Sequence, residues 1–144
     1  MRGLFHWLVG SNTGANKLTA VSFGLLIVRL GTGLMMAVGH GWGKITSFNE
    51  LAMKFPDPLG LGPGLSAALV VFAEFFCAIA VALGLFTRGA AVPLIITMAI
   101  AGFVIHGDDP FGKQELAFMY LTVFATLFFT GAGKFSVDRL FGRK

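Results

Sequence analysis

Four long apolar segments limit what this chain can fold into more than any other feature of its sequence. They cover residues 18–42, 65–86, 90–105 and 116–130. A helix that crosses a bilayer needs about 20 apolar residues, and the last two segments approach that length when they are extended to Arg88 and to 115–133. Hydrophobic residues make up 56% of the chain and charged residues only 12%. The sequence therefore predicts an all-α integral membrane protein, an antiparallel bundle of four transmembrane helices.

The basic residues predict how the bundle is oriented. Lysine and arginine favour the cytoplasmic side of a membrane, and an even number of spans places both termini on one side. The connections that would then face outward contain Lys44, Lys54 and Lys113. The terminal segments and the middle connection contain Arg2, Lys17, Arg88, Lys134, Arg139, Arg143 and Lys144. This difference predicts cytoplasmic termini, and it explains the net charge of +4 without a nucleic-acid-binding surface.

Two segments outside the spans have recognisable roles. The N-terminal segment contains the short apolar run LFHWLV before a polar stretch, which is typical of an anchor at the membrane surface. In the first outer connection, Ser47 and Glu50 have the spacing of a capping box for a short amphipathic helix over FNELAMKF, which Pro56 ends. We expect an interfacial segment over 1–17, a four-span domain over 18–133 and a basic cytoplasmic tail over 134–144.

Ionisable residues within the apolar segments define the candidate site. On the first segment, Arg29, His40 and Lys44 recur on one helical face, which predicts a polar stripe turned toward the bundle. Counting about 1.5 Å per residue from the outer ends places Arg29 and Glu74 at the same depth, where an ion pair would offset the burial of both charges. The predicted pocket opens outward, with Arg29 and Glu74 as its floor and a rim of His40, Lys44, His106 and Glu115.

Three stretches of the chain resemble the DoxX family of small four-span bacterial membrane proteins. They are VRLGTGLMMAVGHGWGK, AEFFCAIAVALGLFTRGAAVPLIITMAIAGFVIH and GKQELAFMYLTVFATLFFTGAGKFSVD. The family's recurring features match Arg29, the glycine-rich run up to Lys44, Glu74, the turn over 83–88, His106 and Glu115. The resemblance implies an inner-membrane protein associated with thiosulfate:quinone oxidoreductase complexes, with oxidative-stress complexes containing superoxide dismutase and a sulfurtransferase, or with detoxification of quinones and catechols.

The candidate residues suit quinone chemistry. A neutral imidazole can donate and accept protons near neutral pH, so His40 and His106, together with Glu115, are candidate catalytic residues that pass protons to a quinone. The candidate cofactor-binding residues are Arg29, Glu74 and Lys44. We therefore expect a membrane subunit of a redox or sulfur-compound system that binds a quinone or a small oxidised molecule. Its expected partners are the lipid bilayer and either soluble redox proteins or a second copy of the chain.

The same residues allow other interpretations. Arg29 and Glu74 can serve only to fix the helix register. His40 and His106 can hydrogen-bond to lipid headgroups, ligate a haem, or bind a metal ion together with Glu115. The threonines at 122, 126 and 130 can bond back to their own helix.

The function also has alternatives at the level of the whole chain. The first is a non-enzymatic scaffold that anchors soluble redox proteins through the tail KFSVDRLFGRK. The second is a transporter of a small solute, although Pro93 is the sole proline inside a predicted span. The single cysteine, Cys77, excludes an intramolecular disulfide, so redox chemistry would require a bound cofactor or a partner.

Overall fold

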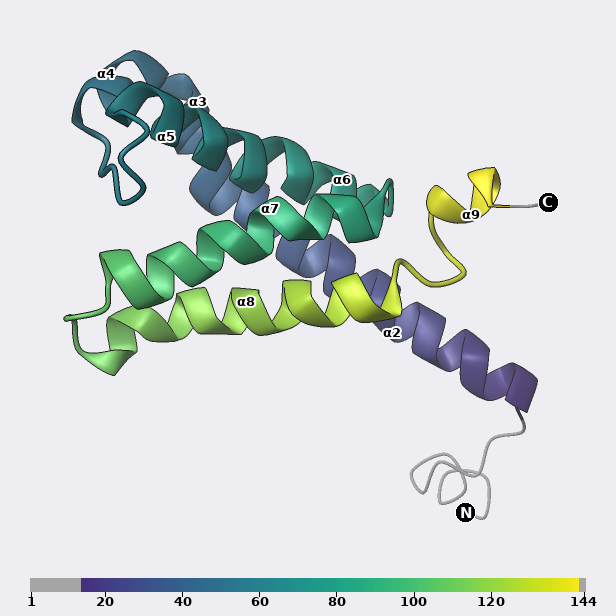
Figure 1. Ribbon diagram of the computed structural model, residues 1–144. Coiled ribbons are helices and arrows are strands. Elements are labelled where there is room, and N and C mark those ends of the chain that lie inside the picture. The colour runs from purple at the N-terminus through teal and green to yellow at the C-terminus, as the bar shows by residue number, and fades with distance from the viewer. Residues whose placement is uncertain (1–13, 143–144) are drawn as a thin grey trace.

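The computed structural model describes residues 14–142 of the chain. These residues form helices joined by turns and contain no strand, so the predicted all-α fold is confirmed for them. Figure 1 shows the long helices arranged as a bundle. Most of the expected interfacial segment over 1–17 lies outside the described residues.

Four long helices make up the described bundle, and three of them contain a short π-helical stretch. The first long helix consists of α2 (Gly14–Met36), η1 (Ala37–Gly41) and α3 (Trp42–Thr46). The second consists of α5 (Pro63–Val71), η2 (Phe72–Cys77) and α6 (Ala78–Leu83). The third consists of α7 (Thr87–Ile100) and η3 (Ala101–Ile105), and the fourth is α8 (Phe111–Thr130). Two short helices complete the described elements, α4 (Phe48–Lys54) and α9 (Asp138–Phe141).

Three of the described helices are long and apolar enough to cross a membrane. They extend over Lys17–Thr46, Pro63–Leu83 and Thr87–Ile105. The fourth long helix, α8, has 20 residues, but Lys113, Gln114 and Glu115 lie in its first turns. A fourth membrane crossing therefore stays a prediction.

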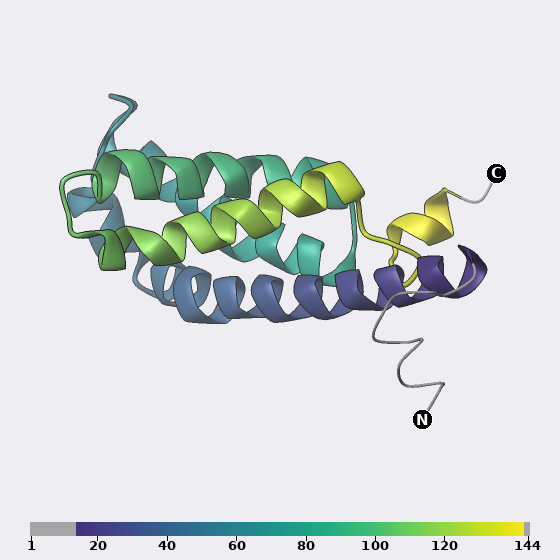
Figure 2. The ribbon, with the colours of Figure 1, turned by 90° about the horizontal axis from the view of Figure 1, so that it is seen from below.

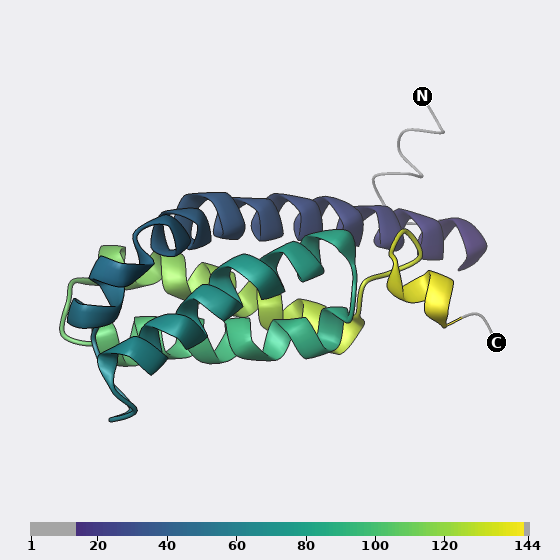
Figure 3. The same ribbon diagram turned by 90° about the horizontal axis from the view of Figure 1, so that it is seen from above.

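Figures 2 and 3 show that the two ends of the described chain lie at one end of the bundle. We call this the terminal end, and it also holds the turn between α6 and α7. The opposite end, which we call the loop end, holds the connection from α3 to α5 and the turn between η3 and α8. Placement of both ends together agrees with an even number of crossings, while the side of the membrane that they face stays a prediction.

The centre of the bundle is filled by small and aliphatic side chains around a few aromatic rings. Its fully buried members include Ala78, Val81, Leu94, Phe124 and Leu127, which belong to one contiguous cluster. Half of the apolar stretch of the second long helix is buried, against 28% for the first and the third, so the second helix is the most central of the three. The threonine ladder of α8 bonds back to its own helix as predicted, since each of the three hydroxyls donates to the carbonyl four residues earlier at 2.8 Å.

Two glycines set the register between the first and second long helices. A Cβ added at Gly41 would lie 2.6 Å from the carbonyl oxygen of Glu74, and one at Gly33 would lie 2.7 Å from that of Ala78. Real Cβ contacts are longer than this, so the two backbones touch at these positions. The two helices therefore approach closely at Gly33 and Gly41, whereas Gly39 and Gly43 have no atom within 4 Å of an added Cβ.

The connection at the loop end folds over the second long helix. The helix predicted over FNELAMKF is present as α4. The prediction that Ser47 caps this helix is wrong, because the Ser47 hydroxyl donates instead to the carbonyl of Gly43 at 2.8 Å. After α4, the carboxylate of Asp57 accepts bonds from the backbone N–H groups of Leu61 at 2.9 Å and Gly62 at 2.7 Å, and from the Ser66 hydroxyl at 2.8 Å. Asp57 thereby ties residues 55–62, which we call the lid, to the start of α5.

Candidate functional site

Lys44 and Glu74 form an ion pair between the first and second long helices. The Glu74 side chain is only 6% exposed, so its carboxylate depends on a charged partner to offset desolvation. The contact between Gly41 and the Glu74 backbone brings Lys44 close to Glu74, because Lys44 follows Gly41 by less than one helical turn. The ion pair is therefore a product of the register between these two helices.

Arg29 does not pair with Glu74, so the ion pair predicted between them is wrong. At about 1.5 Å per residue, Arg29 lies some 22 Å from Lys44 along the same helix, toward the terminal end. Its side chain is fully buried and donates to the carbonyl oxygens of Ala82, at 3.4 Å, and Phe135. Arg29 therefore belongs to the terminal end, away from the other candidate residues of the first helix.

Lys44, Glu74 and His106 line a cavity of about 280 Å³ between the second and third long helices. The other wall residues of α5, η2, α7 and η3 are apolar apart from Ser66 and Thr97. Four lid residues line the loop end of the cavity: Phe55, Pro56, Pro58 and Leu59. An apolar cavity with a few polar groups gathered on one wall is typical of a small-molecule site. We call it the main cavity.

A second, smaller cavity of about 170 Å³ lies against the same ion pair, and we call it the inner cavity. It shares Lys44, Glu74, Ala101 and His106 with the main cavity. His40, Lys113 and Tyr120 also line it, and the rings of His40 and Tyr120 pack edge to face with centroids 5.8 Å apart. The ion pair and His106 thus stand between two cavities, one mainly apolar and one lined by titratable groups.

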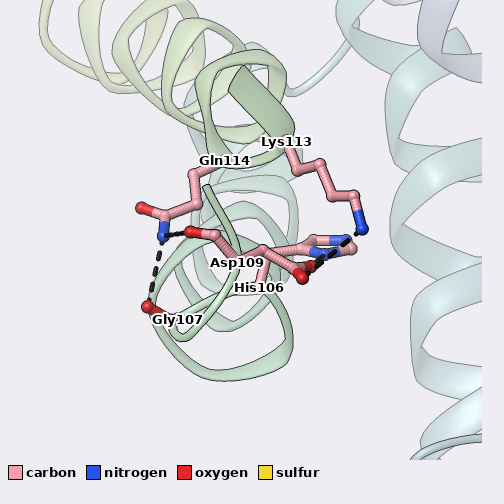
Figure 4. A network of polar contacts seen from close by, with 5 residues as sticks. All are labelled: His106, Gly107, Asp109, Lys113 and Gln114. Atoms are coloured by element: carbon pink, nitrogen blue, oxygen red, sulfur yellow. Dashed lines mark hydrogen bonds and ion pairs between the residues drawn. The ribbon is translucent and has the colours of Figure 1, made fainter. Parts of the chain in front are cut away.

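His106 is held by a network of polar contacts in the turn before α8, as Figure 4 shows. Its Nδ1 lies 2.8 Å from Asp109 Oδ2, while Lys113 Nζ lies 3.4 Å from Asp109 Oδ1. The hydrogen bond from His106, followed by the nearby charge of Lys113, lowers the pKa of Asp109 below its ordinary value. The carboxylate of Asp109 orients the His106 ring through Nδ1, so Nε2 is the ring nitrogen that remains for a ligand.

Gln114 stabilises the same turn through the backbone. Its Nε2 donates to the carbonyl oxygens of Gly107 at 3.2 Å and Asp109 at 2.8 Å, as Figure 4 also shows. These bonds connect the first turn of α8 to the turn that follows η3, so they hold in place the segment that contains His106.

Glu115 lies apart from this cluster. Its side chain is exposed and lines a separate groove with Thr32 and Met119, between α2 and α8. The structure therefore brings together His40, Lys44, Glu74 and His106, and it places Arg29 and Glu115 elsewhere. A metal site built from His40, His106 and Glu115 has no support in this arrangement, and no group of three such ligands occurs within residues 14–142. The catalytic and binding roles of the candidate residues stay predictions.

Sequence reasoning missed several residues of the site. Tyr120 carries a signal that could have identified it, because it recurs with Ala117, Phe124 and Leu127 on the buried face of α8. Asp109 and Lys113 also carry a signal in their spacing, because His106 and Asp109 are three residues apart and Asp109 and Lys113 four. The contact of Ser66 with Asp57 depends on how the connection between them folds.

Three π-helical stretches surround the site. His40 lies in η1 and Glu74 in η2, while η3 ends immediately before His106. A π-helical turn contains an extra residue, so it changes which side chains face the bundle from that point onward, and such turns are frequent at functional sites. The polar residues of the two cavities are therefore placed by local departures from α-helical geometry.

Comparisons with known proteins agree with this architecture. The DoxX family model matches residues 24–107, which include Lys44, Glu74 and His106. The inner membrane protein YqjF of Escherichia coli strain K12 is 31% identical over 125 residues, which cover 84% of this chain and 94% of that protein. Two uncharacterized proteins of Haemophilus influenzae are 28% identical over 114 residues and 34% identical over 116, each covering 76% of this chain and respectively 72% and 84% of their own lengths. No solved structure matches the chain. This chain therefore belongs to the DoxX family and is a membrane protein similar to an inner membrane protein of Escherichia coli.

Proposed function

We propose that this protein is the membrane subunit of a redox system and that it binds a quinone or a similar small oxidised molecule in the main cavity. The observation that carries the proposal is the meeting of Lys44, Glu74 and His106 at one wall of an otherwise apolar cavity. A quinone has the matching character, because its ring is flat and apolar while its two carbonyl oxygens accept hydrogen bonds.

The polar wall supplies donors for such an oxygen. A lysine ammonium has three donors, so Lys44 can hold Glu74 and still donate to a ligand. In its imidazolium form His106 adds a second donor through Nε2, while Nδ1 donates to Asp109, which fixes the orientation of the ring. Because Glu74 is almost fully buried, its carboxylate stays paired with the Lys44 ammonium and holds that ammonium at the cavity wall.

Reduction of a quinone consumes protons as well as electrons, and the inner cavity is suited to supply the protons. His40 and His106 line it, and an imidazole is a side chain that commonly serves as a general acid or base. In this proposal the electrons come from a redox partner of the complex. Glu115 has no part in it, because it lines a different groove.

The proposal is tested with the full-length protein purified into lipid nanodiscs. We expect a bound quinone in its extracted lipids, and saturable binding when a dimethoxymethyl-benzoquinone is added. His106→Ala should weaken that binding by about tenfold, as the loss of one hydrogen bond from a polar site predicts. Glu115→Gln is the matched control and should leave the affinity within about twofold. Absence of binding by the wild-type protein, or equal losses in the two variants, would contradict the proposal.

A further inference from the structure

The second and third long helices diverge from the turn that joins them at the terminal end. Figure 1 shows α6 and the start of α7 close together, while α5 and the end of α7 lie apart at the loop end. The third long helix packs on the second through α6 and η2. The main cavity fills the wedge between the two helices, with residues of α5 and η2 on one side and of α7 and η3 on the other.

The main cavity reaches the outer surface of the bundle between these two helices. Leu69 on α5 and Ile96 on α7 both line the cavity, yet their side chains are 46% and 52% exposed. Side chains that line a cavity and are also half exposed mark the edges of its opening. Because these helices are apolar enough to cross a membrane, the opening faces lipid acyl chains.

The other approach to the cavity, from the loop end, passes the lid, in which Leu59 is 57% exposed. The lid residues Phe55, Pro56, Pro58 and Leu59 lie over it. Asp57, between the two prolines, is bonded to the backbone of Leu61 and Gly62 and to the Ser66 hydroxyl. A ligand that came from water would pass a segment that Asp57 anchors, whereas one dissolved in the bilayer meets the opening between Leu69 and Ile96 directly.

We propose that the main cavity takes its ligand sideways from the bilayer, and that this ligand is an amphiphile with a polar ring and a hydrocarbon chain. The ring reaches Lys44, Glu74 and His106, and the chain leaves between Leu69 and Ile96 into the lipid. The cavity volume of about 280 Å³ suits a ring but not a long chain as well, so the chain lies outside. This inference rests on the proposed function and assigns its ligand to lipid-soluble rather than water-soluble quinones.

The test compares two ligands that share one ring, a dimethoxymethyl-benzoquinone without a side chain and the same ring with a decyl chain. Leu69→Trp narrows the opening, and Ile96→Trp narrows it from the opposite helix. Leu65→Trp is the matched control, because Leu65 lies one turn earlier on α5, is 53% exposed and does not line the cavity. Binding to wild-type and variant proteins is measured in nanodiscs, after size-exclusion chromatography has confirmed that each variant is monodisperse.

We expect Leu69→Trp and Ile96→Trp each to lower the affinity for the decyl quinone by about tenfold, and to leave that for the chainless ring within about twofold. Leu65→Trp should change neither affinity. The inference is overturned if the two opening variants leave decyl quinone binding unchanged, or weaken both ligands equally. It is also overturned, with the proposed function intact, if the wild-type protein binds only the chainless ring. If the wild-type protein binds neither ligand, the proposed function fails as well.

Discussion

Two buried charges in this protein are stabilised in different ways. The guanidinium of Arg29 presents several donors in one plane and meets the carbonyl oxygens of Ala82 and Phe135. The carboxylate of Glu74 can only accept, and it meets the ammonium of Lys44. The first charge joins three segments of backbone at the terminal end, and the second lines the cavities near the loop end. Arg29 is accordingly a structural residue in this account, and Lys44 and Glu74 are the proposed ligand-binding residues.

Replacement of Arg29 should lower stability without removing the ligand site. Arg29→Met deletes the donors to the Ala82 and Phe135 carbonyls, and a hydrogen bond to a charged group is worth about 1.5–3 kcal/mol. We expect a clear loss in the free energy of unfolding, measured by denaturant titration in detergent. Arg29→Lys keeps the charge and should lose less. An unfolding free energy for Arg29→Met equal to that of the wild type would show that these bonds contribute nothing.

The ion pair should show coupling in a double-mutant cycle. Lys44→Met leaves the buried Glu74 carboxylate without a partner, which costs about 3–5 kcal/mol when a buried pair is broken. Glu74→Gln removes that charge, so the double variant should recover part of the loss. Thermal unfolding of the four proteins measures the coupling. Additive losses in the double variant would mean that the two side chains act independently.

At the scale of whole helices, the sequence predicted the segments well and their register poorly. The predicted and observed helices overlap because apolar runs of membrane length can form little else. The prediction that Arg29 and Glu74 lie at the same depth was wrong, because residues of the first helix were counted from Gly41 as its outer end. The helix continues to Thr46, and Gly41 itself packs on Glu74. Close backbone contacts and π-helical turns set the register, and neither can be read from hydropathy. The cluster of His40, Lys44 and His106 was predictable from the polarity of these residues. Glu74, at the centre of the cluster, was assigned the wrong partner because that assignment depended on the register.

The register itself can be tested at Gly41. Gly41→Ala places a methyl group 2.6 Å from the Glu74 carbonyl oxygen, which forces the two helices apart. Overpacking of this kind costs about 1–3 kcal/mol, and we also expect weaker quinone binding because the ion pair is displaced. Gly43→Ala is the control, since its Cβ meets no atom within 4 Å and alanine favours helix by about 1 kcal/mol over glycine. If both variants unfold at the same temperature, the contact does not set the register.

The lid should loosen in acid. The hydrogen bond from the Ser66 hydroxyl, followed by that from the Gly62 backbone, lowers the pKa of Asp57. Because the folded-state pKa lies below the unfolded value of about 3.9, the stabilisation is present at neutral pH and is lost as the pH falls through the folded-state pKa. We expect proteolysis within 55–62 to accelerate in that acidic range. Asp57→Ala should be cleaved faster already at neutral pH, and a cleavage rate equal to that of the wild type would contradict the assigned anchor.

At the scale of the whole molecule, the C-terminal segment is part of the bundle. The Asp138 carboxylate accepts bonds from the backbone N–H groups of Phe86 at 2.6 Å and Thr87 at 3.0 Å, which begin the third long helix. The Asp138 N–H donates to the Gly84 carbonyl at 2.8 Å, and Phe135 accepts from Arg29. Deletion of residues 134–144 would therefore remove structural contacts as well as basic charge. A scaffold role for the tail is better tested by charge reversal at the exposed Arg139 than by truncation.

The two ends of the molecule thus have separate tasks in this account. Arg29 and Asp138 connect segments at the terminal end. The ion pair, the two cavities and the lid lie toward the loop end, where Lys44 and His106 face the proposed ligand. The central claim is that the ligand's oxygen lies against Lys44 and not against Arg29.

The most direct test of that claim is the equilibrium affinity of the decyl benzoquinone for two variants of the first long helix, Lys44→Met and Arg29→Lys. Both are measured in nanodiscs and expressed per folded molecule. We predict that Lys44→Met lowers the affinity by about tenfold, whereas Arg29→Lys leaves it within about twofold. A loss in Arg29→Lys as large as that in Lys44→Met would contradict the account and place the ligand at the terminal end.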